Sequence, residues 1–82
     1  EPNVMTTWLK VKASIEGFLY GLWQQGALVG SKPQDAYFVN VGLGTTMTQQ
    51  DVLNGYLKVT VGAAPSRPAE FIVLTFAQKL QQ

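Results

Sequence analysis

Apolar positions recur along the first third of this chain at the spacing of an α-helix. From Trp8 to about Gln25 they are separated by three or four residues, as on one face of a helix. They comprise Trp8, Val11, Ile15, Phe18, Leu19, Leu22 and Trp23. At about 100° per residue these side chains fall within an arc of roughly 140°, which predicts a long amphipathic helix. The candidates for its N-cap are Asn3, Thr6 and Thr7, and Gly26 suits the position after its last turn.

The opposite face of this helix carries small residues where a solvated face usually carries long polar ones. It is formed by Lys10, Ser14, Gly17 and Gly21, with Ala13 and Gln24 beside them. Each glycine costs about 1 kcal/mol of helix propensity. Either another body approaches this face closely, or the glycines are tolerated or end the helix early. Lys12 lies near the edge of the apolar arc, with Glu16 one turn on as a partner.

Three later segments, residues 36–41, 56–62 and 69–79, show the alternation of β-strands, and the signal of the last one fades beyond Ala77. Residues 33–36 are expected to form one helical turn capped by Ser31. Residues 48–51 begin a short helix that Gly55 ends. This order predicts a single α+β domain over residues 1–82, with a small, mainly antiparallel sheet of about three strands. The long N-terminal helix is expected to pack across one face of that sheet.

A double-proline corner precedes the third strand. Pro65 and Pro68 each hold φ near −65° and lack a backbone donor, so we expect a stiff, extended connector here. Arg67 and Glu70 flank the second proline and can pair, either within the chain or across an interface. The corner residues of interest are therefore Pro65, Arg67, Pro68 and Glu70.

The strand after this corner is apolar on both of its alternating faces. Phe71 and Val73 point one way, and Ile72, Leu74 and Phe76 point the other way. A strand that is apolar on both sides must be covered on both sides. The chain's own helix is expected to cover one side. The functional question is which partner covers the other side.

Composition excludes several classes of function. The chain has no cysteine and no histidine, which removes thiolate metal sites and the commonest general base. The carboxylates form no spaced pair, and the glycine-rich segment at residues 42–46 lacks the lysine of a P-loop, so no enzyme activity, metal or cofactor is predicted. A net charge of +1 argues against nucleic-acid binding, and no run of residues predicts a membrane span or signal peptide. Since the chain starts at Glu1 without a methionine, we expect it to be a fragment or a processed product.

Several motifs in order resemble the C-terminal domain of contractile-tail sheath proteins. They are residues 8–30 (the helix and its turn), 36–39, 51–57 and 64–73, of which Ala64-Pro65-Ser66-Arg67-Pro68-Ala69-Glu70-Phe71-Ile72-Val73 is the most specific. The segment 41–51 resembles phage-derived extracellular injection systems more than ordinary myophages, which tend to carry a cysteine and acidic residues there. The resemblance covers nearly the whole chain.

The resemblance implies a structural subunit that stacks in helical rings around an inner tube and contracts to drive the tube into a target cell. Such subunits are assembled in the bacterial cytoplasm and carried in the released extracellular particle. The implied partners are other sheath subunits, whose arms add strands to this domain's sheet, and the inner tube protein. The implied interface strand and arm comprise Phe71, Val73, Thr75, Ala77, Gln78, Lys79 and Leu80, with the arm running from 78 to 82, and the implied tube contacts are Lys10 and Lys12.

Two readings of the open sheet edge follow. A sheath fragment that lacks its neighbours is expected to dimerise, to swap its last strand or to stay monomeric. The alternative is a free-standing binding module that takes a peptide at this edge, as a defined monomer with a saturable ligand.

Overall fold

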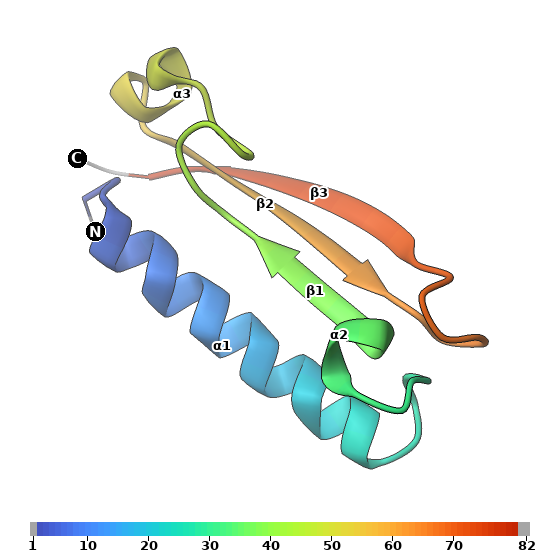
Figure 1. The fold of residues 1–82 in the computed structure, drawn as a ribbon. Helices are drawn as coiled ribbons and strands as arrows, with labels where there is room; N and C mark the ends of the chain where they lie inside the picture. Colours follow the sequence, from blue (N-terminus) through green and yellow to red (C-terminus); the bar gives the residue numbers. More distant parts are fainter. Residues whose placement is uncertain (1, 81–82) are drawn as a thin grey trace.

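The computed structural model describes residues 2–80, which form a three-stranded sheet with a long helix along one face (Figure 1). The elements, in chain order, are α1 (Met5–Gln24), α2 (Pro33–Ala36), β1 (Tyr37–Asn40), α3 (Gln49–Leu53), β2 (Tyr56–Ala63) and β3 (Ile72–Lys79). The predicted α+β fold is confirmed. Of the described residues, no helix is both long and apolar enough to cross a membrane.

The ends of α1 differ from each other in how they are capped. Val4 is the N-cap and no side chain caps the helix, so the predicted caps are wrong: Thr6 and Thr7 lie inside the first turn. At the other end Gly26 has φ +82° and its N–H donates to the Trp23 carbonyl at 3.0 Å. The N–H of Ala27 donates to the Leu22 carbonyl at 2.9 Å, which completes a Schellman motif. The predicted role of Gly26 is therefore confirmed.

The sheet has the order β1-β2-β3, and both pairings are antiparallel. The β2–β3 register runs from Tyr56 opposite Lys79 to Ala63 opposite Ile72 without interruption. Gln78 and Lys79 are paired in this way, so the strand continues to Lys79 as predicted, although its sequence signal fades beyond Ala77. Pairing with Tyr56 and Leu57 of β2 holds these two residues in the sheet despite their polar side chains.

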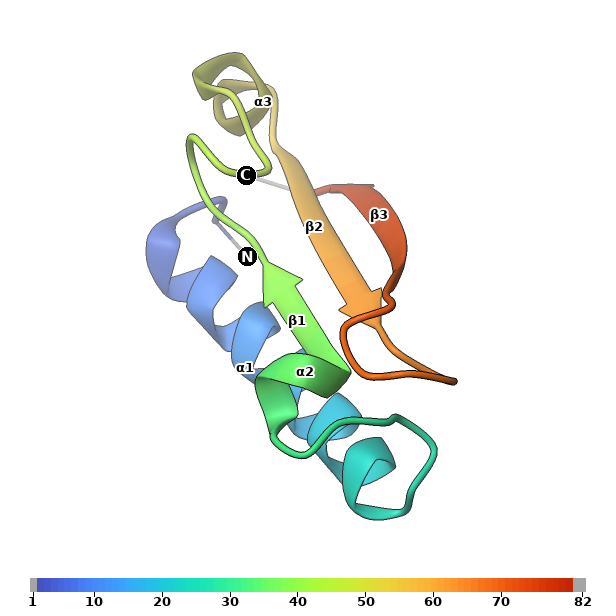
Figure 2. The ribbon, with the colours of Figure 1, turned by 45° about the vertical axis from the view of Figure 1, so that its right-hand side comes forward.

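The core lies between α1 and the first two strands. Its buried residues are Trp8, Leu19, Leu28, Ala36, Val39, Met47, Leu57 and Val59. Figures 1 and 2 both show α1 beside β1, with β3 as the strand farthest from the helix. The expectation that α1 covers one side of β3 is therefore wrong, since the helix is too narrow to reach across all three strands. Phe18, predicted for the core, is 68% exposed.

The proline corner is a docked turn, so the predicted extended connector is wrong. The Glu70 N–H donates to the Arg67 carbonyl at 3.2 Å, and Ala69 has φ +59°, as in a type II turn with Pro68 at its second position. The Ala69 N–H also donates to the Asp35 carbonyl at 2.7 Å, which ties the turn to α2. That short helix is confirmed, but no side chain caps it, so the cap predicted at Ser31 is wrong.

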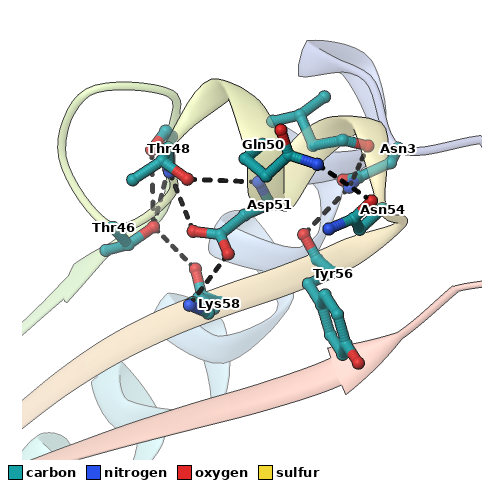
Figure 3. Close-up of polar contacts among 10 residues, drawn as sticks. Asn3, Thr46, Thr48, Gln50, Asp51, Asn54, Tyr56 and Lys58 are labelled. Atoms are coloured by element: carbon teal, nitrogen blue, oxygen red, sulfur yellow. Dashed lines mark hydrogen bonds and ion pairs between the residues drawn. The ribbon is translucent and has the colours of Figure 1, made fainter.

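Two polar clusters hold the end of the sheet near α3 (Figure 3). The short helix predicted to begin at residues 48–51 is confirmed as α3, and Thr48 and Asp51 form a reciprocal capping box at its start. Asp51 also pairs with Lys58 of β2 at 3.0 Å. The hydroxyl of Thr46 donates to the Lys58 carbonyl at 2.6 Å. This bond satisfies a β2 carbonyl on the side of β1, just beyond the point where β1 ends.

Asn3 forms the second of these clusters. The residue is 4% exposed, and its side chain donates to the Tyr56 carbonyl at 2.9 Å and, more weakly, to the Val52 carbonyl at 3.4 Å. Its amide oxygen accepts from the Trp8 indole N–H at 2.6 Å. Asn3 thus clamps the start of α1 to the α3–β2 junction instead of capping the helix.

Candidate interaction edge

The outer edge of β3 presents a regular row of free backbone groups. The Leu80 N–H donates to the Gly55 carbonyl at 2.7 Å, in the same register as the rest of the β2–β3 pair. Residues in an antiparallel strand alternate between bonding inwards and pointing outwards. The even-numbered residues of β3 therefore bond to β2. Those that direct their N–H and C=O groups outwards are Val73, Thr75, Ala77 and Lys79.

The edge at β1 offers much less. The Ala64 N–H donates to the Ala36 carbonyl at 2.8 Å in the β1–β2 register, so only Tyr37 and Val39 within the strand point outwards. β1 has 4 residues, whereas β3 has 8. The β3 edge is therefore the better site for strand addition.

The helix side of β3 is an uncovered apolar surface. Ile72, Leu74 and Phe76 are 59%, 54% and 55% exposed. They share a face with Val59, opposite Phe76 in the register, which α1 and its neighbours bury. Val59 is buried and Phe76, one strand away on the same face, is exposed, so the surface covered by α1 ends between β2 and β3.

The other side of β3 carries a smaller aromatic contact. The rings of Phe38 and Phe71 meet edge to face with their centroids 5.0 Å apart. Farther along, the hydroxyls of Thr60 and Thr75 lie 3.5 Å apart across the β2–β3 pair. Val73, between these contacts, is 53% exposed. Phe71 is thus partly used within the chain, while Val73 and Thr75 remain accessible.

The β3 edge lacks the features that usually protect an edge strand. Natural edges are blunted by charge, proline, bulges or shortness. Within β3 the only charged side chain is Lys79, whose ammonium lies 5.6 Å from the centroid of the Tyr56 ring. The strand contains no proline and keeps one register along its whole length. Such an edge is a template for another strand.

The structure places the predicted interface residues unevenly. Val73, Thr75, Ala77 and Lys79 form the free edge. Gln78 bonds inwards to β2, and Leu80 packs against the core. Residues 78–80 are therefore part of the domain and not a loose arm, and Gln81 and Gln82 lie outside the described residues.

Sequence reasoning did not assign Ile72, Leu74 and Phe76 to the interaction surface. Their alternation was visible, but we expected the helix to cover them. The signal that would have found them is geometric, because one helix spans about 10 Å and the three strands together are wider.

The corner residues lie on the surface. Arg67 and Glu70 form an ion pair at 3.6 Å, with side chains 76% and 67% exposed. A pair so exposed contributes about 0–1 kcal/mol. Pro65 and Pro68 are also exposed, and buried Ala64 anchors the corner by accepting the Val29 N–H at 2.8 Å.

The two predicted tube-contact lysines occupy different surfaces. Lys10 is exposed on the face of α1 that carries Gly17 and Gly21, where added side-chain atoms would meet nothing within 4 Å. The glycines do not end the helix early, since α1 continues to Gln24. Lys12 is half-buried and lines a groove beside β1 together with Glu16.

Titration and metal binding add little to this surface. Burial, with smaller effects from Glu16 and Tyr20, raises the pKa of Tyr37. Hydrogen bonds from the Thr48 backbone and then from Lys58 lower the pKa of Asp51. Within residues 2–80, no group of three or more His, Cys, Asp or Glu side chains is arranged to hold a metal ion.

No family model and no curated protein match this chain. Solved structures do match. A chain in a cryo-EM structure of the anti-feeding prophage (AFP) baseplate, symmetrised six-fold, is 52% identical over 98% of this chain with a TM-score of 0.79. A chain in the sheath complex of PVC, an extracellular contractile injection system, in its contracted state is 55% identical over 98%, with a TM-score of 0.78.

A third structure, the AFP baseplate in its contracted state, contains a chain that is 51% identical over 96% of this chain with a TM-score of 0.75. The chain spans 22% of the first of these relatives and 23% of the other two. The likenesses therefore extend through both sequence and fold of this domain, and they confirm the resemblance read from the sequence motifs.

Proposed function

Because this chain is related to the sheath-like components of contractile injection systems, we propose that it is one domain of a structural subunit of such a particle. The domain links neighbouring subunits into a sheath around an inner tube. Contraction of that sheath drives the tube into a target cell. The subunits are assembled in the bacterial cytoplasm and act in the released extracellular particle, and the domain carries no catalytic step.

The observation that carries this proposal is the free edge of β3. A neighbouring subunit supplies an extended segment that bonds to the outward groups of Val73, Thr75 and Ala77. Backbone hydrogen bonds provide the attachment, and alternate side chains of the added strand meet the exposed apolar row of β3. Such a joint keeps subunits connected while they slide and rotate.

Thr75→Pro in the full-length subunit tests this linkage. Proline removes one outward N–H, and β2 loses no hydrogen bond because residue 75 points away from it. We expect sheath polymerisation to fail while the subunit stays folded. Thr75→Val keeps the N–H and the branched side chain, and it serves as the matched control. Normal polymerisation of the proline variant, seen by electron microscopy, would exclude the β3 edge as the joint.

Deletion of residues 78–82, the predicted arm, is a less specific test. It also removes the Gln78 and Lys79 pairings to β2 and the Leu80 contact with the core. We expect loss of polymerisation together with a lower unfolding temperature. Polymerisation that survives the deletion would exclude a linking role for these residues.

Lys10 and Lys12 are proposed as contacts to the inner tube through charge. Because they lie on different surfaces, Lys10→Glu and Lys12→Glu are to be tested separately. The one that faces the tube should weaken sheath assembly on tubes and change its salt dependence. Unchanged salt dependence for both variants would remove this part of the proposal.

A peptide-binding module is the second candidate, favoured by the same unprotected edge. It predicts saturable binding of an extended peptide by a monomer, without assembly. Light scattering of full-length subunits across concentration separates the two, since growing particles support the sheath role and a constant monomer mass supports the module.

A further inference from the structure

We propose that the free edge of β3 also pairs with β3 of a second copy of this chain. The two strands run antiparallel and join the two sheets into one, with Thr75 of both copies on the twofold axis. The proposal goes beyond the sheath role because it requires only the residues of this domain.

The hydrogen-bonding pattern of the edge permits this pairing. A twofold axis perpendicular to the sheet brings the same edge of two copies together with their helices on the same side. Under this symmetry odd-numbered residues meet odd-numbered residues, and these are the ones that point outwards. Thr75 then exchanges hydrogen bonds with Thr75 of the second copy, and Val73 does so with Ala77.

The turn before β3 selects this register. A pairing shifted by two residues places Lys79 opposite Ala69. The Ala69 N–H already donates to the Asp35 carbonyl at 2.7 Å, and its φ of +59° breaks the strand. A shift by two residues in the opposite direction places Phe71 beyond Leu80 of the second copy, so Phe71 has no strand residue opposite it. Only the pairing centred on Thr75 uses the whole edge from Phe71 to Lys79.

The side chains are self-complementary in this register. On the helix side Leu74 lies opposite Phe76 of the second copy, which joins two exposed apolar rows and shields both. Lys79 is the only charged residue of β3, and antiparallel pairing carries the two lysines to opposite ends. No like charges therefore face each other.

The other sheet edge limits assembly to a dimer. After pairing, the outer edges of the joined sheet are two copies of β1, a strand of 4 residues. Only Tyr37 and Val39 point outwards there, which is too short a row to template further growth. The association is isologous and closed.

Sedimentation equilibrium of this chain tests the proposal. The mass should rise with concentration and level off at twice the 9.0 kDa of one chain. Thr75→Pro should hold the mass at 9.0 kDa, and Thr75→Val should still dimerise. A wild-type monomer at every concentration, or a dimer that the proline leaves intact, would overturn the proposal.

A single-cysteine cross-link provides a second test that does not depend on how well the proline variant folds. The chain has no cysteine, so Thr75→Cys introduces one thiol at the twofold axis. Mild oxidation should convert most of this variant to a covalent dimer, whereas exposed Lys10→Cys should stay largely monomeric. Equal cross-linking of both variants would overturn the proposal. The two proposals fail on different results. If this chain is always monomeric, the dimer is excluded, but β3 can still accept a strand from a neighbouring subunit in the sheath. If full-length Thr75→Pro subunits polymerise normally, only the proposed link between sheath subunits is excluded.

Discussion

The ring of Phe38 lies directly on Gly62, and a Cβ built at residue 62 would fall well inside van der Waals contact with it. Phe38 and Gly62 are neighbours on β1 and β2, and the ring reaches across the glycine to meet Phe71 beside β3. Because glycine has no side chain at this position of β2, the Phe38 ring of β1 can cross β2 and contact Phe71, immediately before β3.

Gly62→Ala should destabilise the domain by about 1–3 kcal/mol, because the added methyl displaces the Phe38 ring and breaks its contact with Phe71. Urea unfolding followed by tryptophan fluorescence measures this change. Gly17→Ala is the control, since its Cβ meets nothing within 4 Å and alanine favours the helix. It should stabilise the isolated chain by up to about 1 kcal/mol. A neutral Gly62→Ala would show that the ring moves at no cost.

Gly17→Ala also tests whether another body packs on the small-residue face of α1. In assembled particles a close contact at that face would make the same alanine unfavourable. If it stabilises the chain and leaves assembly unchanged, the glycines are only tolerated.

Asn3→Ala should lower the free energy of unfolding by about 2–3 kcal/mol. The substitution leaves the buried Trp8 indole N–H and the partly buried Tyr56 carbonyl without their partner. Thermal and urea unfolding measure the loss. Thr6→Ala is the control, because exposed Thr6 caps nothing and its substitution should stay within about 0.5 kcal/mol. Equal effects of the two would restore a capping role for Thr6 and contradict the clamp.

Ala69→Gly should stabilise the domain by up to about 1 kcal/mol, because a left-handed backbone costs an alanine roughly 1–2 kcal/mol and glycine almost nothing. Part of the gain is offset by the greater freedom of glycine in the unfolded chain. Ala13→Gly, in the middle of α1, should instead destabilise by about 1 kcal/mol. A destabilised Ala69→Gly would contradict the type II turn.

Acid should remove the stability that Asp51 supplies. The folded-state pKa of Asp51 is lowered, first by the Thr48 backbone N–H and then by Lys58. The contribution is therefore fully present above the unfolded pKa of about 3.9 and is lost as the pH falls through the lower folded pKa. Unfolding measured from pH 7 to pH 2 should show a shallower acid loss for Asp51→Asn than for the unmodified chain. Parallel curves would indicate that other carboxylates dominate acid unfolding.

The sequence predicted those features that depend on a few neighbouring residues. The spacing of Trp8, Ile15 and Leu19 specified α1, Gly26 specified its end, and Thr48 with Asp51 specified the start of α3. The motif order also indicated the family. Each of these features depends on contacts within one or two turns of chain.

Long-range contacts decided the rest. Asn3 has the side chain of an N-cap, but its amide instead donates to the Tyr56 carbonyl and accepts from the Trp8 indole N–H. Gln78 and Lys79 look polar and irregular, yet pairing with β2 makes them strand. Such outcomes depend on residues about 20 to 50 positions away, which no local pattern records.

The sequence by itself determined that β3 is apolar on both faces and that the chain makes one long helix, two short helices and three strands. Only the tertiary structure decided that α1 lies beside β1 (Figure 2). This position leaves Ile72, Leu74 and Phe76 exposed. The reason is one of width and order: a single helix covers about two strands, and the chain sequence places β3 third from the helix. The exposed strand, and with it the interaction edge, follows from that arrangement.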